Sequence, residues 1–248
     1  MAMNTKKTRS GYSRLLTFAV LVAACLLVIY LVGGQNRLKN VEVECLNGQI
    51  TEAQKDAVIR SSTLKMGAQV SSIADIENAV KTGVNNTGFA RFESVERISK
   101  NTIRLTVSVR YPVAVVAAGG YYILIDGEGM VMDVLSQMPS EAVVYVTGAD
   151  VSNYSKGKTL VLRKEKQLED IIRIASAIKN MGYQATYSEL NVKDLKDIYL
   201  VTNTSQIVEI FDGQNIEQTL QMVDEIIKSG SVKGKITVSG DYAGYSPR

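Results

Sequence analysis

The chain contains 248 residues, with two cysteines, no histidine and a formal net charge of +3. The lack of histidine excludes Ser-His and Cys-His nucleophiles, histidine-ligated metal sites and a sortase-like transpeptidase in its usual form. Four of the 28 basic residues lie in the first 34 positions, which contain no acidic residue, so the remainder has 24 Lys and Arg against 25 Asp and Glu, a charge of −1. We therefore expect no nucleic-acid partner.

An uncharged apolar run extends from Leu15 to Val32. As a helix it would reach about 27 Å, close to the thickness of a hydrocarbon core. The basic residues before it are Lys6, Lys7, Arg9 and Arg14. By the positive-inside rule, this pattern predicts a cytoplasmic tail over 1–14 and a transmembrane helix over 15–34, with the rest of the chain outside the cell membrane. A cleaved signal peptide and a lipoprotein signal at Cys25 are the alternatives, and a single-pass anchor in the lipid bilayer fits the length of the run better.

The next segment, residues 35–112, predicts a β-α-α-β-β unit. Alternating apolar residues lead into the turn signal Asn47-Gly48, and Thr51 with Gln54 has the pattern of a capping box at a helix start. A second helix is expected from Ser72, and two strands follow it. The expected strands are Leu38–Cys45, Phe89–Ile98 and Ile103–Tyr111. Pro112 cannot donate to a ladder and marks the boundary of this unit.

Residues 113–240 predict a β-rich unit with two or more helices packed on its sheet. Each helix has a regular apolar face, and Gly182 is suited to end the first one. The expected helices are Lys166–Met181 and Ile216–Lys228. The expected strands are Val113–Ala118, Tyr121–Ile125, Met130–Val134, Val143–Val146, Ala185–Val192, Asp197–Thr202, Gln206–Phe211 and Lys235–Ser239. Residues 241–248 are expected to form a short C-terminal tail. The fold class is therefore α+β with an N-terminal transmembrane helix.

Three carboxylates lie close together in sequence, at Asp126, Glu128 and Asp133. Paired carboxylates can perform hydrolysis, so a membrane-anchored envelope hydrolase is one hypothesis for this chain. Asp126 stands beside two glycines, however, and such a residue more often caps an Asx-type turn. We expect no catalytic residue, cofactor or metal.

The order of these segments resembles the FtsQ/DivIB bacterial cell-division proteins. The similar segments are NVEVECLNG before a TEAQ helix start, VSVRYPVAVV at the unit boundary, YYILIDGEGMVMDV with Asp126, Gly129 and Val131, and the closing ITVSGDYAGYSPR. The resemblance implies a POTRA-like domain at 35–112 and an FtsQ/DivIB-type β-domain at 113–240.

The resemblance also implies a non-enzymatic function. Members of that family link early and late cell-division proteins at the septum by binding small bitopic proteins of the FtsB/DivIC and FtsL type, and a septal peptidoglycan synthase is a further candidate partner. A POTRA-containing secretion or sensor component remains an alternative.

In that family a partner adds a strand at the end of the β-domain. On this chain the corresponding residues are Lys235, Ile236, Thr237, Val238, Ser239, Tyr242 and Tyr245. An exposed last strand would present unpaired backbone groups to a partner, and the two tyrosines would anchor it. The alternative is that this strand only completes the sheet, with the tyrosines covering its edge.

Overall fold

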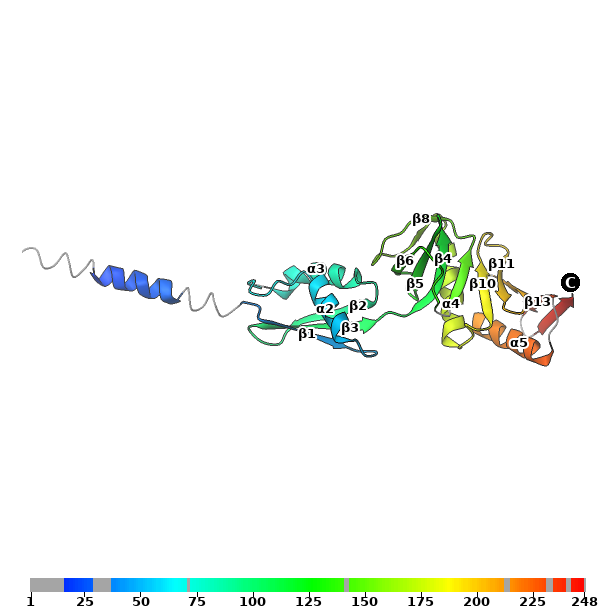
Figure 1. The fold of residues 1–248 in the computed structure, drawn as a ribbon, viewed down its shortest axis with the longest axis horizontal. Helices are drawn as coiled ribbons and strands as arrows, with labels where there is room; N and C mark the ends of the chain where they lie inside the picture. The colour runs from blue at the N-terminus through cyan, green and yellow to red at the C-terminus, as the bar shows by residue number, and fades with distance from the viewer. Residues whose placement is uncertain are drawn as a thin grey trace, which may run out of the picture.

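The computed structural model describes residues 16–28, 37–70, 72–140, 143–211, 215–230, 234–239 and 242–247. These residues form an α+β structure with five helices and a large mixed sheet. An isolated helix lies at one end, followed by an N-terminal unit with a small sheet and a C-terminal unit with the large sheet (Figure 1).

The predicted membrane span is wrong. Within the predicted range, residues 16–28 form a helix whose residues are all exposed, and positions 15 and 29–34 lie outside the described residues. None of the helices in the described residues is long and apolar enough to cross a membrane. This overturns the transmembrane helix over 15–34 and the predicted single-pass location at the septum.

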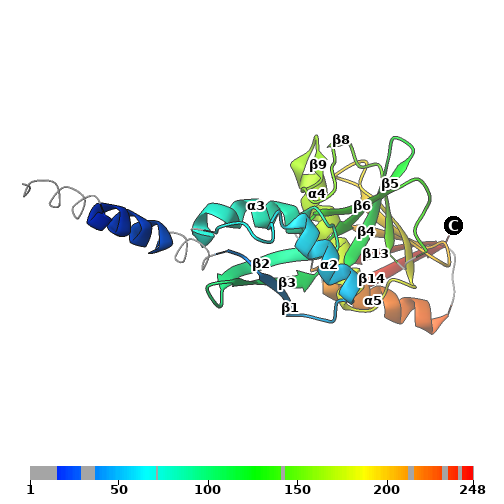
Figure 2. The same cartoon turned by 60° about the vertical axis from the view of Figure 1, so that its left-hand side comes forward.

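The N-terminal unit has the β-α-α-β-β order that was expected. Its three-stranded sheet has the order β1-β3-β2, with β1 parallel and β2 antiparallel to β3. Both helices pack on the same face of this sheet (Figure 2), while Arg104 on the other face pairs with Glu42 and Glu44. The elements are β1 (Asn40–Cys45), α2 (Glu52–Ser61), α3 (Ile73–Asn85), β2 (Ala90–Arg97) and β3 (Thr102–Val109).

The capping box at the start of α2 is confirmed. The Thr51 hydroxyl accepts from the Gln54 backbone N–H, and the Gln54 side chain accepts from the Thr51 N–H. This exchange satisfies two of the backbone donors that a helix N-terminus leaves without partners.

The C-terminal unit is built on a nine-stranded sheet of order β14-β13-β12-β11-β10-β7-β4-β5-β6. The helices α4 and α5 bury their apolar sides against one face of this sheet, where the main core lies. The elements are β4 (Pro112–Ala118), β5 (Tyr121–Asp126), β6 (Val131–Leu135), β7 (Val144–Thr147), β8 (Val151–Asn153), β9 (Val161–Leu162), α4 (Glu165–Asn180), β10 (Tyr187–Asn191), β11 (Ile198–Thr202), β12 (Ile207–Ile210), α5 (Ile216–Ser229), β13 (Gly234–Ser239) and β14 (Tyr242–Pro247).

Two features of this unit differ from expectation. The short hairpin of β8 and β9 was not predicted, because neither strand shows a sustained apolar alternation. The predicted C-terminal tail is largely a strand, since residues 242–247 form β14 and pair antiparallel with β13. The outermost strand on this side of the sheet is therefore β14.

Candidate functional site

The predicted partner-binding strand, Lys235–Ser239, lies inside the sheet. It corresponds to β13, which pairs parallel with β12 on one side and antiparallel with β14 on the other. Its backbone is therefore flanked by two strands of the same chain. The expectation that this strand forms the sheet edge is wrong, because residues 242–247 form a further strand that pairs with it.

The side chains of β13 are also occupied within the molecule. Ile236 and Val238 are buried in the main core. On the opposite face, the Lys235 ammonium pairs with the Glu209 carboxylate, and the Thr237 hydroxyl donates to the same carboxylate at 2.9 Å. Only Ser239, the last residue of the strand, is exposed. These contacts give β13 a structural role in the sheet.

The two predicted tyrosines lie on β14 but in different environments. Tyr245 is partly buried and packs against the main core. Its ring covers Gly234 so closely that a Cβ at position 234 would lie 2.7 Å from the ring, as when an aromatic side chain shields a strand glycine. Tyr242 is 83% exposed and stands at the outer end of the sheet. Of the two tyrosines, Tyr242 is therefore the one that a second protein can reach.

The free edge of the sheet is β14 itself. In the part of the chain that the structure describes, β13 is the only strand paired with it. Successive residues of a strand direct their backbone groups to opposite sides, so part of this backbone faces away from β13. We name the outward side of Tyr242–Pro247 the β14 edge.

Sequence reasoning missed Ala243, Gly244 and Ser246 as part of this edge, although a signal was available. The dipeptide Gly240-Asp241 stands directly between Ser239 and Tyr242. Two residues of this type between short strands are typical of a tight β-hairpin. The segment lacks the apolar alternation of the other strands, and hydropathy alone therefore predicts a tail.

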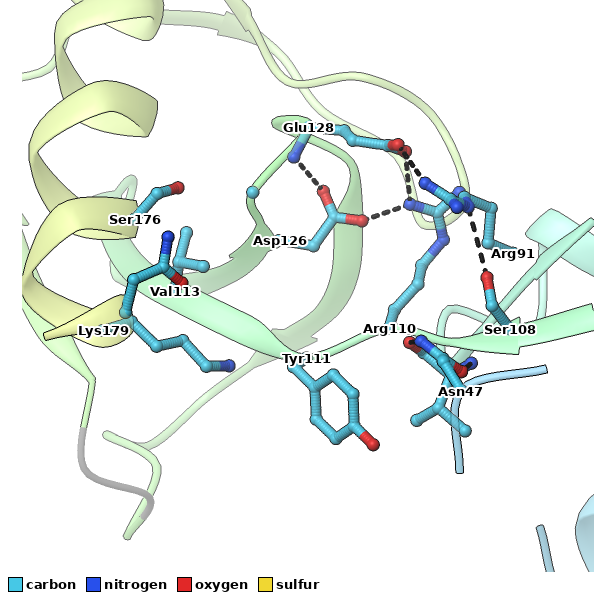
Figure 3. Close-up of a pocket in the computed structure, with 13 residues that line it drawn as sticks. Asn47, Arg91, Ser108, Arg110, Tyr111, Val113, Asp126, Glu128, Ser176 and Lys179 are labelled. Atoms are coloured by element: carbon cyan, nitrogen blue, oxygen red, sulfur yellow. Dashed lines mark hydrogen bonds and ion pairs between the residues drawn. The ribbon is translucent and has the colours of Figure 1, made fainter. Parts of the chain in front are cut away.

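A second candidate lies between the two units, where a cavity of about 350 Å³ is lined by residues from both (Figure 3). Asp126 stands on its wall. One Asp126 oxygen accepts from the Glu128 and Met130 backbone N–H groups at 2.9 and 2.8 Å, and the other accepts from the Arg110 guanidinium. The Asx-turn interpretation of Asp126 is therefore confirmed.

The other two carboxylates of this region also form ion pairs with basic side chains. Glu128 accepts from Arg91 and Arg110, and Asp133 pairs with Lys156 at 3.4 Å. Partial burial alone would raise the pKa of Glu128, but the hydrogen bonds from the two arginines lower it below its ordinary value. A hydrolytic general acid needs a raised pKa, so this environment is opposite to the one that the hydrolase hypothesis requires. Within the described residues, no cluster of acidic or cysteine side chains is arranged to hold a metal ion.

Neither a protein-family model nor any curated protein matches this chain.

Proposed function

We propose that this chain is a non-enzymatic scaffold that binds a partner protein by strand addition at the β14 edge, as its resemblance to the FtsQ/DivIB cell-division proteins implies. The partners would be small proteins of the FtsB/DivIC and FtsL type. The observation that carries the proposal is that β14 ends a nine-stranded sheet and has β13 as its only paired strand among the described residues.

The chemistry of the edge supports this role. An edge strand has a row of backbone N–H and C=O groups that a second chain can pair with, and this pairing supplies affinity without a deep pocket. Tyr242 adds a large, rigid and exposed side chain at the same place. Tyrosine contributes apolar contact area and a polar hydroxyl, and it is enriched among residues that dominate binding energy.

The other edge residues leave room for an incoming strand. Gly244 has no side chain, and the nearest atom to a Cβ built there is the Thr237 carbonyl oxygen at 3.8 Å. A side chain of the partner could therefore lie over Gly244 between Tyr242 and Ser246, which are both exposed.

The test measures binding of the full chain to the soluble segment of an FtsB/DivIC-type protein by biolayer interferometry. Tyr242→Ala should weaken binding about tenfold or more, which corresponds to about 1.4 kcal/mol. The matched control is Tyr121→Ala, because Tyr121 on β5 is also an exposed tyrosine, at 48%, but lies far from β14 in the sheet order. This control should bind like the unmodified chain.

Two proline variants test strand addition directly. Ala243→Pro and Gly244→Pro remove N–H groups that point to opposite sides of β14. One of them should abolish partner binding while β13 and β14 stay paired, and the other should detach β14 from β13. Unchanged binding in Tyr242→Ala and in both proline variants would overturn the proposal. Dimers of the chain that disappear in the same variants would instead identify a second copy as the occupant of the edge.

A further inference from the structure

The connection between the two units is short, and one of its two side chains is buried. Only Arg110 and Tyr111 separate the end of β3 from the start of β4. The Arg110 side chain is 3% exposed. It donates to Asp126 and Glu128 in the C-terminal unit, and its other terminal nitrogen lies 3.4 Å from the Asn85 side-chain oxygen on α3. One guanidinium thus contacts both units.

A second arginine reinforces this contact from the N-terminal unit. Arg91 on β2 pairs with Glu128 across the junction and with Glu93 on its own strand. We name Arg91, Arg110, Asp126 and Glu128 the Arg110 cluster; Figure 3 shows it at one side of the cavity. The Arg91 pair is partly exposed and therefore weak by itself. The buried Arg110–Asp126 pair is different, because separating it would leave a charge without compensation.

The backbones of the two units also meet, at two glycines. Gly88, between α3 and β2, has a φ of +80°, and a Cβ there would lie 2.0 Å from the Met132 carbonyl oxygen of β6. Gly157, between β8 and β9, has a φ of +77°, and a Cβ there would lie 2.6 Å from the Asn86 Cα. Each unit therefore contributes one glycine to a contact too close for any side chain.

The connection is held on its other side by α4. The Lys179 ammonium donates to the Pro112 carbonyl oxygen at 2.7 Å and lies 5.1 Å from the centre of the Tyr111 ring. The first residue of β4 and the residue before it are therefore both in contact with a helix of the main core. A hinge needs residues that are free to change their backbone angles, and this connection has few.

We propose that the junction is a rigid lock: the Arg110 cluster and the contacts at Gly88 and Gly157 fix the orientation of the two units, so that they move as one body. Domains within a chain commonly move relative to one another unless their interface prevents it. Here a buried ion pair, two backbone contacts and a short connection act together. A protein bound to one unit would be held at a fixed distance and orientation from the β14 edge.

The test uses residual dipolar couplings of backbone amides, measured on the full chain. In the unmodified chain, one alignment tensor should fit the amides of both units. Gly88→Ala should remove this common fit, because its methyl group cannot be accommodated against Met132. The matched control is Gly119→Ala: Gly119 also has a positive φ, of +58°, but no atom lies within 4 Å of a Cβ there. This control should keep the single tensor.

A second variant removes charges at the same junction. Arg110→Met combined with Asp126→Asn removes the buried pair without leaving one charge unpaired, and it should also give two tensors. Arg104→Met, which removes ion pairs inside the N-terminal unit only, serves as its control. Couplings within each unit report whether that unit is still folded. Two tensors in the unmodified chain, or a single tensor in both junction variants, would overturn the proposal.

Discussion

The two edges of the nine-stranded sheet differ in how their backbone groups are satisfied. At the β6 edge, Val131 donates to the Lys158 carbonyl oxygen and accepts from Gly157, both at 2.9 Å, and Leu160 donates to Gly129 at the same distance. The chain itself thus covers the start of this edge. At β14, the described residues provide no strand beyond the last one. An uncovered edge can pair with another chain, so the comparison supports the proposal that a partner binds at β14.

The largest effect is expected from opening the covered edge. Leu160 anchors the segment over β6 and is fully buried in the main core. Leu160→Ala should lower the free energy of unfolding by about 2–5 kcal/mol, because it leaves a cavity beneath that segment. Urea denaturation of the full chain measures this value. Val161→Ala is the control, since Val161 is exposed, and it should change stability by less than about 0.5 kcal/mol. Equal losses in both variants would contradict the covering role of Leu160.

A smaller and more local effect is expected at the uncovered edge. Gly234→Ala would place its methyl group 2.3 Å from the Ser246 carbonyl oxygen and 2.7 Å from the Tyr245 ring. We expect β14 to move away from β13, at a cost of about 1–3 kcal/mol. Hydrogen exchange should show lost protection in β13 and β14 but not in β4 and β5. Gly244→Ala has space for its methyl group and should keep the protection of the parent chain; equal behaviour of the two variants would refute the proposed crowding.

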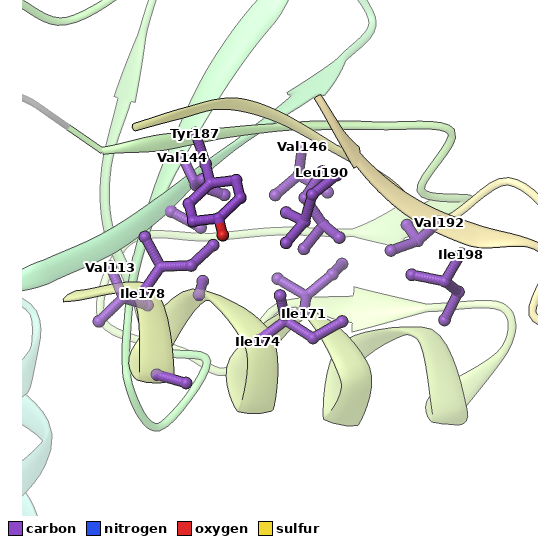
Figure 4. Close-up of a cluster of buried hydrophobic side chains, with 14 of the residues drawn as sticks. Val113, Val144, Val146, Ile171, Ile174, Ile178, Tyr187, Leu190, Val192 and Ile198 are labelled. Atoms are coloured by element: carbon purple, nitrogen blue, oxygen red, sulfur yellow. The ribbon is translucent and has the colours of Figure 1, made fainter. Parts of the chain in front are cut away.

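The strand β10 lies midway between the two edges and is paired with a strand on each side. Tyr187 on β10 points its ring into the core beside Val144 and Ile178 (Figure 4), and its buried hydroxyl has no hydrogen-bond partner among the described residues. Removing an unsatisfied buried hydroxyl is neutral or favourable. Tyr187→Phe should therefore raise the free energy of unfolding at pH 7 by up to about 1 kcal/mol. A loss of more than about 1 kcal/mol would show that the hydroxyl has a partner.

Because of Tyr187, the stability of the protein should also depend on pH in the alkaline range. Burial, followed by the nearby Asp224 and Tyr183, raises the pKa of Tyr187 above its ordinary value. The unfolded chain ionises this tyrosine near pH 10, whereas the folded chain keeps it neutral. Stability is thus lost as the pH rises above about 10, and Tyr187→Phe should reduce that loss. Thermal unfolding at pH 8 and pH 11 compares the two proteins.

The smallest effect is expected where the covered edge meets the N-terminal unit. The hydrogen bonds of Arg91 and Arg110 lower the pKa of Glu128, although its partial burial opposes them. Its ionised form therefore contributes stability above about pH 4.5, and this contribution is lost as the pH falls through the lowered pKa. Glu128→Gln should lower the melting temperature slightly at pH 7 and flatten its decrease toward pH 3. The effect is small because the side chain is 52% exposed and screened by solvent. Glu52→Gln, at an exposed intrahelical pair, is the control and should leave the melting temperature at pH 7 unchanged.

Much of this fold follows from local patterns in the sequence. The apolar faces of α4 and α5 and the capping box at Thr51 each predict the observed element, because the physics that forms them acts within a few residues. The Arg110–Asp126 pair was also predictable from the sequence. The turn at Gly119-Gly120 places Pro112 opposite Asp126 in the β4–β5 hairpin, which brings Arg110, two residues before Pro112, close to that carboxylate.

Other features depend on contacts that no local pattern records. The apolar run near the N-terminus predicts burial in some apolar environment, but hydropathy alone does not establish a membrane span. The close approaches at Gly88 and Gly157 join segments of different units, and a loop glycine has many possible reasons to be there. The β14 edge was missed because an edge strand that is open to solvent on one side needs few apolar residues.

The brevity of the connection through Arg110 and Tyr111 also bears on how the molecule assembles itself. Each unit has its own core, and the junction contacts need both units in their native form. Docking of the units then follows their separate folding. Because two residues tether them, each unit experiences the other at a high effective concentration. Docking is therefore a first-order step, and its rate is independent of how dilute the protein is.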